Sequence, residues 1–175
     1  MNTPSRSATC RLVLIALSAL AIPAGAQYSI KDQASAQDTQ VRGYWVDPST
    51  GLMWAGKDNG TDVNWRTATK YCRDLRFGGF SNWRLATIDE LQGIYDSTAQ
   101  APGRGGRHAE VPLTFHIKGS LFLTGDPWSS TQRSDDRGRL IGFGWFFDFL
   151  NVRSRADPTD HVSSKRALCV RPSGG

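Results

Sequence analysis

Apolar residues recur along this chain at two spacings, which predict two helices and a set of short strands. After Asn64, a residue type that caps helices, apolar positions fall three and four residues apart from Trp65 to Leu75. This spacing predicts a helix that Gly78 and Gly79 end. A second helix is expected to run to about residue 95 or 96. It begins at a capping box in which the side chains at positions 87 and 90 satisfy each other's backbone N–H groups.

Short aromatic and β-branched runs predict strands around these helices. The first two flank a turn containing Pro and Gly and form a hairpin. The predicted strands cover residues 43–46, 52–54, 83–85, 121–123, 128–131, 144–150 and 166–171. Two early helices followed by a mostly antiparallel sheet indicate an α+β fold.

The strand over residues 144–150 carries aromatic residues on both faces, which predicts that both faces are buried. Asp148 shares that strand and needs a partner. Arg84 or Arg171 is expected to supply a structural ion pair.

Two stretches lack such patterns. Residues 27–40 are polar and predict a loosely ordered arm or linker before a single domain over residues 41–175. Residues 97–119 are rich in Gly, Pro, Arg and Ser, and a connection of this length is typical of a functional or mobile loop.

The first 26 residues have the three parts of a signal peptide. Arg6 and Arg11 precede an apolar run at residues 12–22, and small residues at 24–26 provide a cleavage site. The run is about half the length needed to cross a bilayer, so no membrane span is expected after signal removal. We expect a bacterial protein located in the periplasm, secreted, or held at the cell surface.

Removal of the signal also removes Cys10 and leaves two cysteines, Cys72 and Cys169. A disulfide between them would join the first helix to the last strand and close a loop of about 100 residues. In the chain-entropy model such a bridge stabilises the fold by about 4–5 kcal/mol. A disulfide fits an oxidising compartment.

The net charge is +5, of which Arg6 and Arg11 leave with the signal. The remaining surplus permits an anionic partner and is too small to indicate a nucleic-acid partner.

Five motifs, taken in order, resemble the Lcl C-terminal-domain family, a bacterial exported family named for the end domain of a collagen-like adhesin. They are Thr50-Gly51-Leu52-Met53-Trp54, Trp65 with Tyr71-Cys72, Trp83-Arg84-Leu85, Trp128-Ser129-Ser130-Thr131 and Cys169-Val170-Arg171. The resemblance implies a C-type-lectin-like fold with the first helix joined by a disulfide to the last strand. The chain departs from the family at Asn151-Val152, where an Asn-Gly turn is common. The framework residues of these motifs and of the aromatic strand are Trp54, Trp65, Trp83, Arg84, Trp128, Ser129 and Trp145. Most of the tryptophans are expected to pack in the core.

No cofactor is predicted, and calcium stays open as an option that no motif supports. Lectin-like folds often bind calcium through carboxylates, and at the matching place this chain has Trp128-Ser129-Ser130, which offers hydroxyls only. The oxygen-rich runs at residues 58–62 and 157–160 are typical of solvated turns. The three histidines of the mature chain are not close in sequence, as a transition-metal site would require. Ser129, His161 and Asp148 could form a hydrolase triad, but no nucleophile motif supports it.

Basic residues in the variable loops are the candidate ligand-binding group. They are Arg104, Arg107, Arg133, Arg137, Arg139, Arg153 and Arg155. If these loops gather at one end of the sheet, the arginines form a rim suited to sulfate, carboxylate or phosphate. In the alternative, nearby aspartates at 135, 136 and 157 neutralise them and they serve solubility.

The favoured function is therefore an exported, non-catalytic module that recognises a glycan, in particular a polyanionic one, or a protein. One alternative is a hydrolase of cell-wall or extracellular polymer, with Glu90 and Asp148 as paired carboxylates. Another is a structural or assembly subunit of the cell envelope that docks through residues 27–40.

Overall fold

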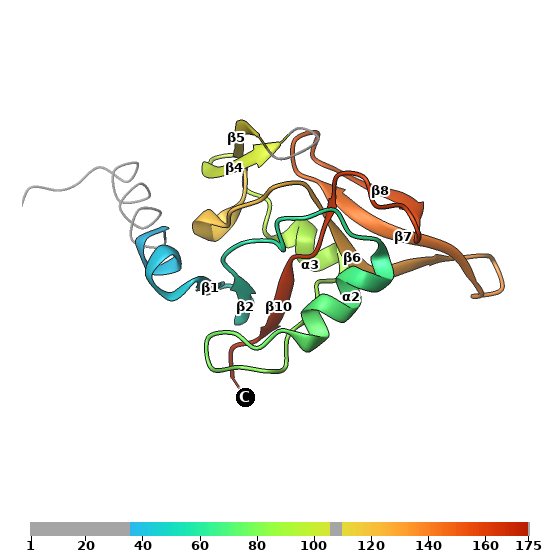
Figure 1. Cartoon of the computed structure of the whole chain (residues 1–175), viewed down its shortest axis with the longest axis horizontal. Helices are drawn as coiled ribbons and strands as arrows, with labels where there is room; N and C mark the ends of the chain where they lie inside the picture. The colour runs from blue at the N-terminus through green and yellow to red at the C-terminus, as the bar shows by residue number, and fades with distance from the viewer. Residues whose placement is uncertain (1–35, 106–109, 175) are drawn as a thin grey trace, which may run out of the picture.

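The structure is a computed structural model that describes residues 36–105 and 110–174. The predicted signal peptide and most of the predicted arm therefore lie outside the described residues. The described chain forms three small sheets and two main helices (Figure 1). No helix in this part of the chain combines the length and apolar character needed to cross a bilayer.

The first sheet joins the two ends of the domain. It contains β1 (Tyr44–Val46), β2 (Leu52–Ala55), β10 (Cys169–Pro172) and β3 (Arg84–Leu85), in the order β1-β2-β10-β3. All its pairs are antiparallel. The predicted first hairpin is confirmed. Its turn is held by the buried carboxylate of Asp47, which accepts hydrogen bonds from Ser49 and Thr50.

The second sheet contains β6 (Asp126–Ser134), β7 (Leu140–Asp148), β8 (Arg153–Pro158) and β9 (Lys165–Arg166), in the order β8-β7-β6-β9. β6, β7 and β8 are antiparallel neighbours, and β9 pairs in parallel with the start of β6. The sequence pattern missed β8. This edge strand is mostly polar, so its residues show no apolar alternation.

The third sheet corrects the prediction of an irregular loop at residues 97–119. β4 (Ala101–Gly105) and β5 (Val111–Phe115) form an antiparallel ladder. Buried and exposed positions alternate along β4 as in any half-buried strand, but its buried residues are Ala101, Gly103 and Gly105. Such small residues carry almost no apolar signal. A Cβ at Gly103 would lie 2.5 Å from the Leu123 carbonyl oxygen, so close packing requires glycine there.

A single-turn 3₁₀ helix, η1 (Lys118–Ser120), follows β5. The strand predicted at residues 121–123 is wrong, because Phe122 and Leu123 make only isolated bridges to Lys57 and Gly103.

Both predicted helices form. α2 (Trp65–Asp74) begins at Asn64, whose side chain accepts a hydrogen bond from the Thr67 N–H. It ends at Asp74, earlier than the predicted glycine stop. α3 (Ile88–Gly93) begins with the predicted capping box of Thr87 and Glu90 and ends two or three residues before the predicted end.

Residues 36–42 are also helical, whereas the sequence predicted no regular structure for the part of this segment before residue 41. Thr39 fixes this turn of helix to the domain, since its hydroxyl donates to the Gly119 carbonyl oxygen at 2.9 Å.

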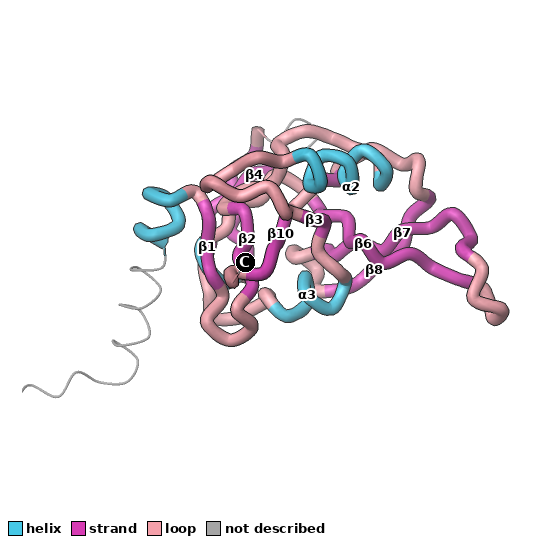
Figure 2. Tube along the Cα trace, turned by 90° about the horizontal axis from the view of Figure 1, so that it is seen from below, coloured by secondary structure: helices cyan, strands magenta, loops and turns pink. Residues whose placement is uncertain are grey.

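Two clusters of buried side chains form the core. One surrounds Trp54, Leu91 and Phe147 beneath α3, and the other surrounds Trp83, Trp128 and the cysteines beneath α2. Figure 2 shows the two helices on opposite sides of β3 and β6. Two helices, antiparallel sheets and a disulfide confirm the α+β prediction and agree with a lectin-like domain.

Candidate functional site

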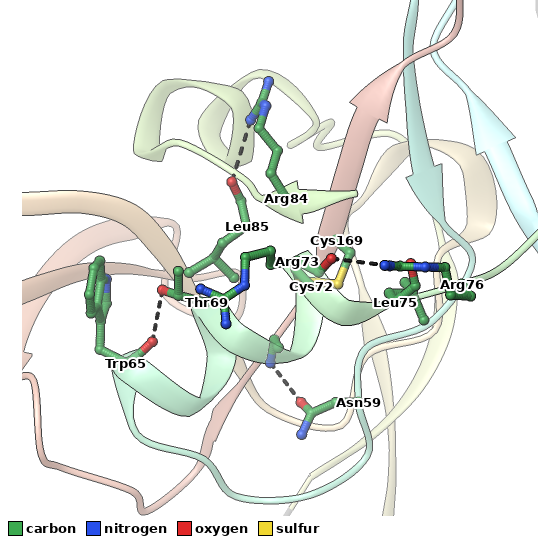
Figure 3. Close-up of a disulfide and its surroundings, with 11 residues drawn as sticks. Asn59, Trp65, Thr69, Cys72, Arg73, Leu75, Arg76, Arg84, Leu85 and Cys169 are labelled. Atoms are coloured by element: carbon green, nitrogen blue, oxygen red, sulfur yellow. Dashed lines mark hydrogen bonds between the residues drawn. A yellow bond between two sulfur atoms is a disulfide. The ribbon is translucent and has the colours of Figure 1, made fainter. Parts of the chain in front are cut away.

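The two described cysteines form a structural disulfide. Cys72 of α2 and Cys169 of β10 form a disulfide across 97 residues, as predicted (Figure 3). Both are buried, and Ala68 and Leu85 lie in the same apolar cluster. The bridge anchors α2 against the first sheet.

Most tryptophans also belong to the framework. Trp54, Trp83 and Trp128 are buried, as predicted. Trp65 is half-buried, and its indole N–H donates to the Ser129 carbonyl oxygen at 2.7 Å. Trp145 differs, because it lies on the partly exposed part of β7 with the Arg133 guanidinium 5.8 Å from its ring centre.

The candidate arginines do not gather into one rim. Arg104 lies on β4, which Figure 1 places away from the far end of β6 and β7. Arg107 lies outside the described residues. Arg133 is on β6, and Arg137 and Arg139 are in the turn that joins β6 to β7.

Arg153 and Arg155 are on a strand, not in a loop, and they lie on the other face of the sheet from Trp145. In the register of β7 and β8, Arg155 stands opposite Phe146 and Ala156 stands opposite Trp145. Directly opposed residues share a face and successive residues alternate between faces. The sheet therefore separates these two arginines from the Arg133–Trp145 pair.

What remains together is the outer part of the β6–β7 hairpin, which extends past the helices in both Figure 1 and Figure 2. We call this part, together with the contacting pair Arg133 and Trp145 nearer the core, the hairpin surface. Its residues are Arg133, Arg137, Arg139, Leu140, Ile141 and Trp145. All are exposed except Trp145, and Leu140 and Ile141 keep 65% and 42% of their surface in solvent.

Asp135 shapes the tip of this hairpin. Its carboxylate accepts from the backbone N–H groups of Arg137 and Arg139, each at 2.9 Å, and from the Arg139 side chain at 2.8 Å. The backbone hydrogen bond from Arg139, together with its side chain, holds the pKa of Asp135 below its ordinary value. Arg139 is therefore oriented by an acid, whereas Arg133 lies over an aromatic ring.

The expected partners of Asp148 are wrong. The carboxylate of Asp148 accepts from the backbone and side-chain N–H groups of Asn151 and so closes the β7–β8 turn. Arg84 instead forms a two-fold hydrogen-bonded pair with Glu90, at 2.6 and 2.7 Å. Burial alone would raise the pKa of Glu90, but the hydrogen bonds to its carboxylate outweigh burial, and the pKa is lowered overall. Arg171 donates to Asn82 and lies 3.9 Å from the Phe80 ring centre.

The oxygen-rich run at residues 58–62 holds the fold together. Asp58 is buried and accepts from the Thr124 N–H and hydroxyl, at 2.6 and 2.9 Å. Burial raises its pKa. Asp62 pairs with Arg166. Within residues 36–105 and 110–174, no three His, Cys, Asp or Glu side chains are grouped as metal ligands would be.

The proposed triad residues have separate roles. Ser129 is fully buried, and its hydroxyl is hydrogen-bonded to the backbone of Thr131 in its own strand. Asp148 is used in the turn described above, and His161 is exposed in the loop after β8.

The burial of Lys165 was not predicted from the sequence. Lys165 of β9 is 5% exposed and lies 3.2 Å from Asp157, 3.6 Å from Asp126 and 3.7 Å from the Phe146 ring centre. Burial raises the pKa of Asp126 to about 6, although Lys165 opposes the shift. A lone lysine in a polar segment has no pattern that marks burial, so only the tertiary structure identifies it.

Residues 43–171 match the family model of the Lcl C-terminal domain. The chain belongs to the Lcl C-terminal domain family. The match runs from the residue before β1 into β10 and includes both bridged cysteines. No curated protein is similar enough to this Lcl C-terminal domain to count as a relative.

Proposed function

We propose that this Lcl C-terminal domain is an exported, non-catalytic binding module whose hairpin surface recognises a polyanionic glycan. The observation that carries the proposal is the contact of Arg133 with the partly exposed Trp145 on the β6–β7 hairpin, whose turn carries two further exposed arginines, Arg137 and Arg139. Guanidinium groups bind sulfate and carboxylate in a two-pronged geometry, and an indole face packs against sugar rings.

Export has separate support. The two cysteines beyond the predicted signal are joined in a disulfide, and such bridges persist in oxidising compartments such as the bacterial periplasm and the cell surface.

Retention on immobilised heparin tests the glycan proposal. We expect the chain to bind at low salt and to elute as salt rises. The variant Arg133→Ser/Arg137→Ser/Arg139→Ser should elute at clearly lower salt. The variant Arg104→Ser/Arg153→Ser/Arg155→Ser is the matched control, because it removes the same charge from other surfaces. An equal loss in both variants, or no retention of the native chain, would contradict the proposal.

Exposed Leu140 and Ile141 favour a second candidate, a protein partner, because aliphatic side chains at a hairpin tip suit a protein interface better than a charged glycan. Leu140→Ser/Ile141→Ser separates the two. Heparin retention should be unchanged by it if a glycan is the partner, whereas a protein contact would be weakened.

A further inference from the structure

A groove beside α2 lies away from the hairpin surface and shares none of its residues. Its walls are formed by the helical residues 36–42, the end of β2, the last turn of α2 and residues 120–122. Its volume is about 390 Å³. Ligand pockets in proteins commonly measure roughly 300–1,000 Å³, so the groove has room for a small organic molecule.

The lining is mainly apolar and aromatic. Its large apolar and aromatic residues are Tyr71, Leu75, Phe77 and Phe122. Tyr71 is 41% exposed and belongs to neither core cluster, unlike its neighbour Leu75. A tyrosine face that does not pack in the core is available to a ligand.

The groove is already formed in the structure. The Gly56 N–H donates to the Gly43 carbonyl oxygen at 2.7 Å, and a Cβ at Gly56 would lie 2.6 Å from that oxygen. The two backbones therefore meet with no side chain between them. On the other side, the hydrogen bond from Thr39 to Gly119 holds residues 36–42 in place. A preformed site binds its ligand without the entropic cost of ordering its own residues.

The charge at the groove is positive. Of the described residues that line the groove, Lys57 alone is charged, and it is exposed. No carboxylate in the described part of the chain forms an ion pair with it. A shallower depression next to the groove is also lined by Tyr71 and Leu75. It contains two basic residues, Lys70 and Arg76, and one acidic residue. That acid, Asp74, is paired with Lys70 and Arg73.

We propose that this groove binds a small amphiphilic anion. The apolar body of the ligand packs against Tyr71, Phe77 and Phe122, and its anionic group lies at the Lys57 ammonium. The site is independent of the proposed hairpin function, because the two surfaces have no residue in common.

The probe is 8-anilinonaphthalene-1-sulfonate, which joins aromatic rings to one sulfonate and fluoresces when it leaves water. The chain should bind it saturably, at one site. Lys57→Glu and Tyr71→Ala should each weaken binding about tenfold, which corresponds to loss of one good contact. Arg153→Glu makes the same charge change away from the groove, and should leave the affinity within about twofold.

The uncharged analogue N-phenyl-1-naphthylamine separates charge from apolar packing. Its affinity should fall in Tyr71→Ala and be unchanged in Lys57→Glu. Amide shifts in the unsubstituted chain give a readout that does not depend on any variant folding. A saturating concentration of 8-anilinonaphthalene-1-sulfonate should shift the amide signals of Gly43 and Gly56. Shifts confined to the hairpin surface, absence of saturable binding, or equal losses in Lys57→Glu and Arg153→Glu would overturn the proposal.

Discussion

Three basic side chains are buried among residues 36–105 and 110–174, and each has a different set of partners. Arg166 donates a hydrogen bond to Thr124 and forms an ion pair with Asp62. Arg171 donates a hydrogen bond to Asn82. Lys165 forms ion pairs with two aspartates and lies over an aromatic ring. A buried charge that loses its partner is strongly destabilising. These residues therefore constrain the fold although none lies in the hairpin surface.

Asp126 makes one of these contacts sensitive to pH. Its pKa is raised by burial to about 6, with Lys165 and Arg155 lowering it and Asp148 raising it. A carboxyl whose pKa is higher in the folded state stabilises the fold when protonated. That contribution is complete below its ordinary value of 3.8 and is lost as pH rises through about 6.

Asp126→Asn removes this dependence. Relative to the native chain, the variant should gain about 2 kcal/mol in unfolding free energy as pH rises from about 4 to 8, because the native chain must ionise a buried carboxyl. Lys165 retains Asp157 as a partner in the variant. Urea unfolding at a series of pH values measures the change. Asp136→Asn, at the exposed hairpin tip, controls for loss of charge. A difference between native chain and variant that stays constant over this pH range would refute the assignment.

At the scale of elements, the turns and caps follow from short sequence motifs. Asn64 caps α2, the Thr87–Glu90 box begins α3, and Asp47 closes the first hairpin. Each motif acts over two to four residues, so the sequence alone identified both helix caps, and it identified the first turn by its Pro and Gly. β4 and β8 were missed because a strand of small residues and a polar edge strand both lack the apolar alternation that predicts strands.

The β7–β8 turn is strained at Val152. Its φ is 53°, a left-handed conformation that β-branched residues rarely adopt. The turn persists because Asp148 accepts two hydrogen bonds from Asn151.

Val152→Gly should stabilise the domain by about 1 kcal/mol, because glycine has no Cβ to clash in this conformation. Denaturant unfolding measures the gain. Val162→Gly is the matched control, since Val162 has a similar exposure, 48% against 45%, and no positive φ. We expect the control to be neutral or slightly destabilised. A loss of stability in Val152→Gly would show that the valine side chain, not backbone strain, dominates at this turn.

At the scale of the whole molecule, the disulfide joins the first large helix to the last strand. The loop that it closes contains β3 to β9, including the hairpin surface and part of the groove lining. Closing a loop of this length reduces the entropy of the unfolded chain much more than that of the folded one.

Cys72→Ala/Cys169→Ala should therefore lower the unfolding free energy by about 4–5 kcal/mol in the chain-entropy model. Urea unfolding of the native and double-variant chains measures the loss, and either single variant should lose a similar amount, since each lacks the bridge. Equal unfolding midpoints for native and double-variant chains would show that the bridge contributes nothing.

The sequence alone determined what short-range patterns encode. It identified the two helix starts, the first hairpin and the family motifs, because each depends on residues that are close together in the chain. It identified the pair of cysteines because only two remain after signal removal. It also identified the arginines that could bind an anion.

Only the tertiary structure decided where those residues lie. It divided the arginines between two faces of one sheet and a separate ladder, placed Lys165 in the interior, and brought Lys57 and Tyr71 to one groove. The physical reason is that strand pairing and side-chain burial depend on contacts between residues far apart in the sequence. Period-two alternation then assigns each strand residue to a face once the register is set.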